Sequence, residues 1–206
     1  MAFVTEFLPA TIWLMRRLLS AAAVLVGTVV VILGTSLASA QAKDSTQKDS
    51  PQKEVAPDVP DAIQAPVGEE VVLLAHATGS QIYSCQATAD GKFSWTLKAP
   101  DAELHDRKDK VIGQHSAGPS WKLKDGSEVT GKAAAHVDSL DGESIPWLLV
   151  KVVSHSGNGL LANVTTIQRV HTHGGQPPAE GCDAAHRDAE IKSSYTADYY
   201  FYAPAK

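Results

Sequence analysis

Apolar and polar residues alternate along much of the chain after residue 68. In residues 92–98 every second side chain is apolar, namely Phe93, Trp95 and Leu97. A period of two is typical of a β-strand with one buried face, because successive side chains of a strand point to opposite faces. The dipeptide Asp90-Gly91 favours positive φ, and it predicts a hairpin that joins this strand to one in residues 81–87.

Three later segments also predict strands. Residues 147–153 are apolar apart from Lys151, which favours a central strand covered on both faces. Residues 160–170 and 195–202 carry the candidate core residues Val164, Ile167, Tyr199 and Phe201. No segment shows helical periodicity over ten or more residues. We therefore predict an all-β fold, an antiparallel β-sandwich or barrel with long loops.

The first 40 residues have the pattern of an export signal. Arg16-Arg17 precedes an uncharged apolar stretch that ends in small residues, so cleavage is expected between Ala40 and Gln41. This predicts an exported chain, periplasmic or extracellular. The apolar stretch is almost long enough to span a bilayer, so an uncleaved anchor in residues 18–40 is the alternative, and the only membrane contact expected. Met15 is a possible true start, because a normal signal begins there.

The rest of the chain divides into a leader and a domain. Residues 41–66 are rich in Pro, Ser, Gln and Lys, a composition that predicts a disordered linker. Residues 67–206 are expected to fold as a single β domain. Residues 41–206 hold 16 basic and 22 acidic side chains. This acidic balance argues against nucleic-acid binding, which needs a basic face.

The chain has two cysteines, Cys85 and Cys182. In an oxidising compartment two lone cysteines are expected to form a disulfide. A free nucleophilic cysteine with a histidine partner is the alternative.

Several separated motifs, taken together, resemble one known family. The motifs are Tyr83-Ser84-Cys85, residues 95–100, 113–121, 145–149 and 154–157, Gln168-Arg169-Val170, Thr172, Gly174-Gly175, Pro178, Gly181-Cys182 and residues 195–202. In this order they resemble the exported domain of unknown function 3455 family of bacteria and fungi. The resemblance covers nearly all of residues 67–204. It implies export and one compact domain, and it supplies no mechanism, because the family has no established activity.

Histidines are the first candidates for chemistry. His171 and His173 are two residues apart, so in a strand both imidazoles could face one metal ion, with His115, His155 or Asp183 as a third ligand. His115 and His155 lie within the family motifs, and each precedes a serine. A Ser–His pair with an acid such as Asp138 is conceivable, although adjacent residues of a strand point to opposite faces. The alternative is that these histidines order turns.

Aromatic residues are the second candidates. Trp121, Tyr200 and Tyr202 could line a cleft for a carbohydrate or an apolar ligand, since rings stack on sugars and hydroxyls give directional bonds. Burial in the core explains the same spacing. No cofactor is predicted.

No strong catalytic motif occurs in the sequence. We therefore expect a non-catalytic binding or envelope-associated module, whose partner is a small molecule, a glycan or an envelope component. The alternative is a secreted hydrolase-like enzyme that uses the motif histidines, with metal assistance if one is bound.

Overall fold

A computed structural model describes residues 53–206 of the chain. The predicted signal or anchor segment, the possible start at Met15, the cleavage site at Ala40 and Gln41, and the first part of the linker lie outside the described residues. Within residues 53–206, no helix has the length and the apolar character needed to cross a membrane. The helical elements of this part are two short 3₁₀ turns, η1 (Asp61–Ile63) and η2 (Ala184–His186).

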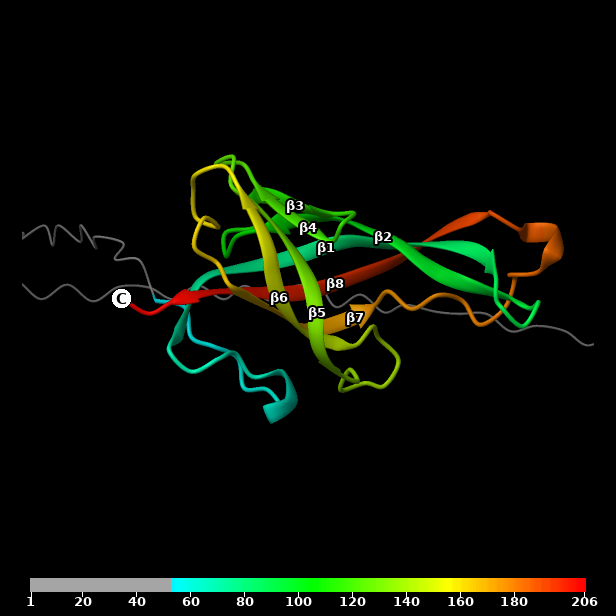
Figure 1. The fold of residues 1–206 in the computed structure, drawn as a ribbon, viewed down its shortest axis with the longest axis horizontal. Coiled ribbons are helices and arrows are strands. Elements are labelled where there is room, and N and C mark those ends of the chain that lie inside the picture. Colours follow the sequence, from blue (N-terminus) through cyan, green and yellow to red (C-terminus); the bar gives the residue numbers. More distant parts are fainter. Residues whose placement is uncertain (1–52) are drawn as a thin grey trace, which may run out of the picture. The chain divides into compact units, whose positions relative to one another are not determined.

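Eight antiparallel strands form one closed barrel (Figure 1). Each strand pairs with the next along the chain, and the last pairs back with the first, so the sheet closes on itself where the eight strands run side by side. The strands are β1 (Glu69–Ala87), β2 (Phe93–His105), β3 (Val111–Ser116), β4 (Ser120–Leu123), β5 (Glu128–Val137), β6 (Trp147–Ser156), β7 (Thr166–Gly174) and β8 (Glu190–Pro204). The predicted all-β antiparallel fold is confirmed, and the structure has the barrel rather than the sandwich.

Glycines with positive φ end two of the hairpin turns. Gly91 lies between β1 and β2 with φ of 78°, and Gly126 lies between β4 and β5 with φ of 88°. Only glycine adopts this region readily, which is why both Asp-Gly dipeptides predict turns correctly.

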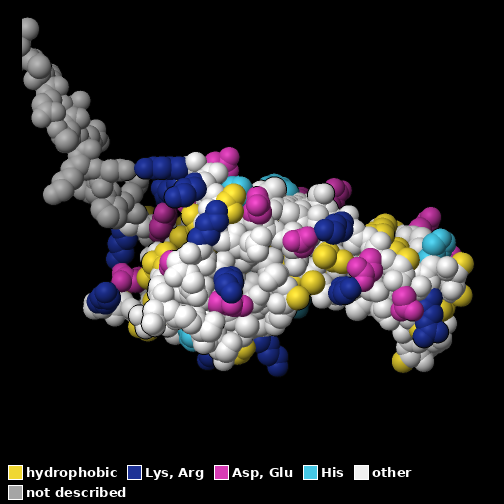
Figure 2. Space-filling model, turned by 90° about the horizontal axis from the view of Figure 1, so that it is seen from above, with side chains coloured by type: hydrophobic (Ala, Val, Ile, Leu, Met, Phe, Trp, Pro, Cys, Tyr) yellow, Lys and Arg dark blue, Asp and Glu magenta, His cyan; other side chains and the backbone are white. Residues whose placement is uncertain are grey.

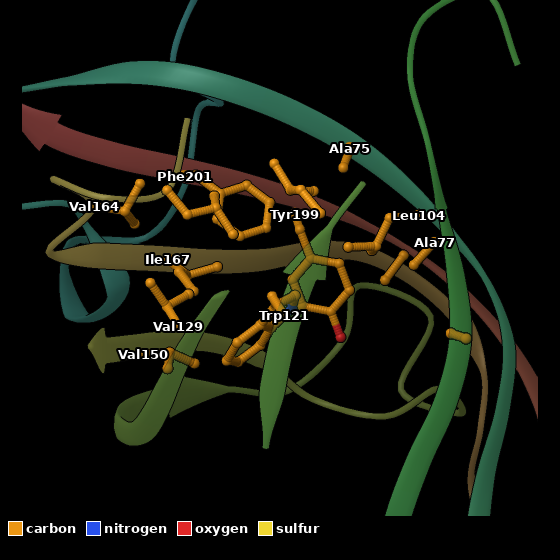
Figure 3. Close-up of a cluster of buried hydrophobic side chains, with 14 of the residues drawn as sticks. Ala75, Ala77, Leu104, Trp121, Val129, Val150, Val164, Ile167, Tyr199 and Phe201 are labelled. Carbon is orange, nitrogen blue, oxygen red and sulfur yellow. The ribbon is translucent and has the colours of Figure 1, made fainter. Parts of the chain in front are cut away.

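The interior of the barrel holds the larger apolar cluster (Figure 3). Tyr199 and Phe201 reach it from β8, and Trp121 reaches it from β4. Val164 and Ile167 are completely buried there, as their positions in the sequence predict. These side chains share the inward face because the period of a strand is two.

A second apolar cluster lies where the segment before β1 packs against the barrel. Ile63, in η1, is completely buried and packs with residues of β1, β6, β7 and β8. The Gln168 side chain donates a hydrogen bond to the Ile63 carbonyl oxygen at 2.6 Å. The end of the predicted disordered linker is therefore structured. Its average composition is polar, but Ile63 buries apolar surface against the barrel, and Val59 and Ala65 pack against the same cluster.

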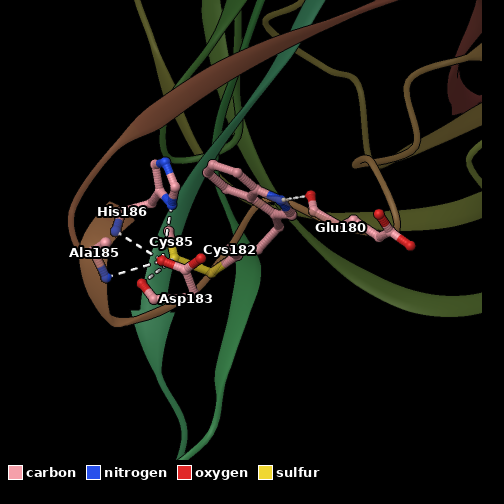
Figure 4. Close-up of polar contacts among 7 residues, drawn as sticks. Cys85, Glu180, Cys182, Asp183, Ala185 and His186 are labelled. Atoms are coloured by element: carbon pink, nitrogen blue, oxygen red, sulfur yellow. Dashed lines mark hydrogen bonds and ion pairs between the residues drawn. A yellow bond between two sulfur atoms is a disulfide. The ribbon is translucent and has the colours of Figure 1, made fainter.

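Strands β1, β2 and β8 are 19, 13 and 15 residues long, and they continue past the shorter strands as an extension (Figure 1). The loop between β7 and β8 lies against this extension and is tied to it by the disulfide Cys85–Cys182 (Figure 4). The Asp183 carboxylate accepts hydrogen bonds from the backbone N–H groups of Ala185 and His186 and so caps η2. The predicted disulfide is confirmed.

Candidate functional site

A cavity of about 490 Å³ opens into the barrel. Its lining is mostly apolar and includes Leu97, Trp121, Val150 and Tyr199. The mouth is accessible to solvent, because the lining residue Leu97 is 52% exposed and the lining residue Ala133 is also exposed. The volume lies within the range of roughly 300–1,000 Å³ that is typical of small-molecule sites.

His115 is a buried residue that lines this cavity. Its Nδ1 lies 2.8 Å from the carbonyl oxygen of Ser120, so Nδ1 carries the proton and donates it there. The pKa of His115 is lowered to about 4, mainly by burial and to a smaller extent by the charge of Arg169, and the hydrogen bond to Ser120 opposes this shift. The imidazole is therefore neutral near pH 7, and it contributes no charge to the cavity.

Two other lining residues carry polar atoms without a hydrogen-bond partner. Gln81 is 1% exposed, and neither its amide nitrogen nor its amide oxygen has a partner among the described residues. The indole Nε1 of Trp121 is also buried and unpartnered there. Gln81 lies opposite Pro100, beside a shift of the β1–β2 register at Ile82 and Tyr83. Such irregularities redirect side chains, and here they accompany an amide that lines the cavity.

Arg169 is the buried cation of the cavity. It is 9% exposed, and its Nε and Nη2 donate to the Pro146 carbonyl oxygen at 3.2 and 2.7 Å. No carboxylate forms an ion pair with Arg169 in residues 53–206. Burial raises the pKa of Tyr199, its neighbour on β8, and the Arg169 charge opposes that rise. A buried guanidinium is thus held by a carbonyl dipole rather than by an acid.

The barrel, the disulfide and the cavity all lie in the region that a family model recognises. The model, described as Protein of unknown function (DUF3455), matches residues 66–203. The chain belongs to the DUF3455 family. This confirms the resemblance drawn from the sequence motifs. No curated protein and no solved structure matches the chain.

The DUF3455 domain does not bring His115 and His155 into one site. His115 lines the cavity, whereas His155 lines a separate hollow near the C-terminus and has its Nε2 2.7 Å from the Val164 carbonyl oxygen. The hydroxyl of Ser116 pairs with that of Ser120 at 3.0 Å rather than with an imidazole. Each motif histidine is bound to a backbone carbonyl, as expected for a residue that orders a turn.

The metal hypothesis rested on His171 and His173. His171 has φ of 49° at a shift of the β7–β8 register, and its Nδ1 lies 2.9 Å from the carboxylate of Asp198. The other oxygen of this carboxylate contacts His76. No group of three His, Cys, Asp or Glu side chains in residues 53–206 is arranged to hold a metal ion. Of the three suggested third ligands, Asp183 pairs with His186, and His115 and His155 each contact a backbone carbonyl.

The three aromatic candidates are also separated. Trp121 lines the cavity, whereas Tyr200 and Tyr202 belong to the second apolar cluster, with Ile63. The hydroxyl of Tyr202 donates to the side-chain oxygen of Gln168. Of these candidates, Trp121 alone is a lining residue of the cavity.

Gln81 and Arg169 are not among the site residues predicted from the sequence. Arg169 is two residues after Ile167, which alternation places in the core, so the same alternation places a cation on the inward face. That signal was available in the sequence, and it predicts a buried charge that needs a partner.

Charged side chains on the outside are mixed in sign. On the face of the molecule shown in Figure 2, Lys and Arg side chains are interspersed with Asp and Glu and do not gather in one basic patch. On that face the distribution is typical of a solvated surface.

Proposed function

We propose that this domain is an exported, non-catalytic binding module that holds a small, largely apolar molecule in the cavity of the barrel. The observation that carries the proposal is the cavity itself, which is apolar, open to solvent at Leu97 and lined by the unpartnered polar atoms of Gln81 and Trp121. A rigid wall with a few polar groups is the usual composition of a ligand site.

Two further features support this function. The disulfide is consistent with an extracytoplasmic location, where such bonds persist. The apolar lining favours a small molecule over a glycan, because sugar hydroxyls need more polar partners than this cavity offers.

The test uses N-phenyl-1-naphthylamine, a neutral dye whose fluorescence rises in apolar surroundings. The wild-type protein is expected to bind it, and Ala133→Trp, which fills the exposed mouth, is expected to weaken binding. Ala134→Trp is the matched control, because Ala134 is also exposed but does not line the cavity. Wild-type protein that leaves the fluorescence unchanged, or two tryptophan variants that bind alike, would contradict the proposal.

A further inference from the structure

The charge balance of the cavity identifies the class of ligand. Arg169 places a full positive charge at the wall, and no acid of the described residues is paired with it. A buried ion without a counter-ion is unfavourable, because the low polarity of the surroundings does not replace its hydration. A bound anion would supply the missing charge.

The unpartnered atoms favour the same chemistry. Of the three unpartnered atoms at the wall, two are hydrogen-bond donors, the Gln81 amide nitrogen and the Trp121 Nε1, and one is an acceptor, the Gln81 amide oxygen. An ionised carboxylate only accepts hydrogen bonds, so it matches a wall formed by a guanidinium, an amide N–H and an indole N–H. His115 is neutral and has committed its N–H to Ser120, so it does not compete as a cation.

The number of buried charges limits the anion. Arg169 is the buried cation among the residues that line the cavity, and Lys132, the other basic lining residue, is exposed. One buried guanidinium balances one negative charge. A phosphate monoester carries between one and two charges near neutral pH and would bury an excess.

On these grounds we infer that the ligand is an apolar monocarboxylic acid, with its carboxylate at Arg169 and Gln81 and its apolar body between Leu97, Val150 and Tyr199. This inference rests on the proposed function and names the chemical class of the molecule bound in the same cavity. Arg169 and Gln81 are then the residues that select an acid over a neutral molecule of the same shape.

The experiment displaces the bound dye with three molecules of equal chain length: octanoic acid, octan-1-ol and octylamine. Octanoate is expected to displace the dye from wild-type protein at a roughly 10- to 100-fold lower concentration than octanol, the range expected for a hydrogen bond to a charged group. Octylamine is expected to displace it least, because its ammonium would meet the Arg169 charge. Equal displacement by octanoate and octanol, or stronger displacement by octylamine, overturns the inference and leaves the proposed function standing.

Variants then identify the residues responsible. Arg169→Met is expected to remove most of the preference for octanoate over octanol, whereas Arg187→Met, which removes an exposed charge outside the cavity, should keep it. Gln81→Leu is the second variant, because it replaces an unpartnered amide by an apolar side chain of similar size and should fold even if Arg169→Met does not. A Gln81→Leu protein with the full wild-type preference would exclude Gln81 from acid recognition, and the same result for folded Arg169→Met would overturn the inference. Absence of dye binding by wild-type protein would instead contradict the proposed function.

Discussion

The imidazole of His115 lies flat against the indole of Trp121, with ring centroids 4.3 Å apart and an angle of 10° between the planes. Tyr199 meets both rings edge-on, at 5.1 and 5.7 Å between centroids. Side chains from β3, β4 and β8 thus form one aromatic group on the cavity wall. The group holds a titratable ring where its charged form is disfavoured, which has a measurable effect on stability.

His115 should make the protein less stable in mild acid. Its pKa is about 4 in the folded protein and 6.5 ordinarily, so between these values the unfolded chain binds more protons than the folded one. The stabilisation from neutral His115 is therefore complete above about pH 6.5 and is lost as the pH falls toward 4, by roughly 3 kcal/mol in total. We expect His115→Phe, which keeps a ring on Trp121, to lose less stability than wild type between about pH 7 and pH 4.5 in urea unfolding.

The control for this prediction is His136→Phe, since His136 is exposed. This variant should follow the wild-type dependence on pH. A His115→Phe protein whose free energy of unfolding falls as steeply as that of wild type would show that another group titrates in this range.

Ile63 should anchor the segment that precedes β1. Truncation to alanine removes a completely buried side chain from the second apolar cluster, so Ile63→Ala is expected to lower the free energy of unfolding by roughly 2–5 kcal/mol. Val55→Ala, at a side chain that is 79% exposed, should change it by less than about 0.5 kcal/mol. Urea unfolding near neutral pH measures both, and equal effects would mean that the segment does not hold the barrel.

The disulfide should stabilise the domain by restricting its unfolded chain. Cys85 and Cys182 are 97 positions apart, and closing a loop of this size contributes at most about 4–5 kcal/mol in the chain-entropy description. Reduction, or the double variant Cys85→Ala/Cys182→Ala, is therefore expected to lower the urea midpoint. Unreduced, denatured protein should have no free thiol in a titration with Ellman's reagent, and two titratable thiols would refute the bridge.

Gly131 should be required for the position of Trp121. A Cβ at this position would lie 2.4 Å from Val150 Cγ1 and 3.2 Å from the Trp121 ring. Gly131→Ala is therefore expected to cost roughly 1–3 kcal/mol and to change the tryptophan fluorescence. Adding Gly131→Ala to a Val150→Ala protein should cost clearly less, because the nearest atom is then absent. Additive effects in this double-mutant cycle would mean that the close approach is not what matters.

The local pattern of apolar and polar residues predicts much of the fold, but it does not predict how deeply a side chain is buried. Residues 92–98 form part of β2, as their alternation indicates, yet Leu97 is 52% exposed and lies at the cavity mouth. The alternation shows on which face of the strand a side chain lies, but it does not show whether other strands cover that face. The pairing of Cys85 with Cys182 was predictable because the chain offers no other pair.

The candidate site was harder to predict because closure of the barrel assembles it. Gln81, Trp121 and Arg169 come from β1, β4 and β7, and no spacing in the sequence brings them together. The sequence drew attention instead to histidines beside serines and glycines. In His115 and His155 those neighbours mark turns, where an imidazole binds a backbone carbonyl, and not catalytic pairs.

The barrel closes where β1 pairs with β8, with Glu69 opposite Pro204. The first strand of the domain therefore cannot form this pairing until the last strand has been synthesised. Tyr199 and Phe201 come from β8, so a nascent domain on the ribosome lacks both the β1–β8 pairing and the centre of its core until β8 has emerged. Such dominance of distant contacts predicts slow, all-or-none folding once β8 is present, and it leaves the growing domain open to chaperones until then.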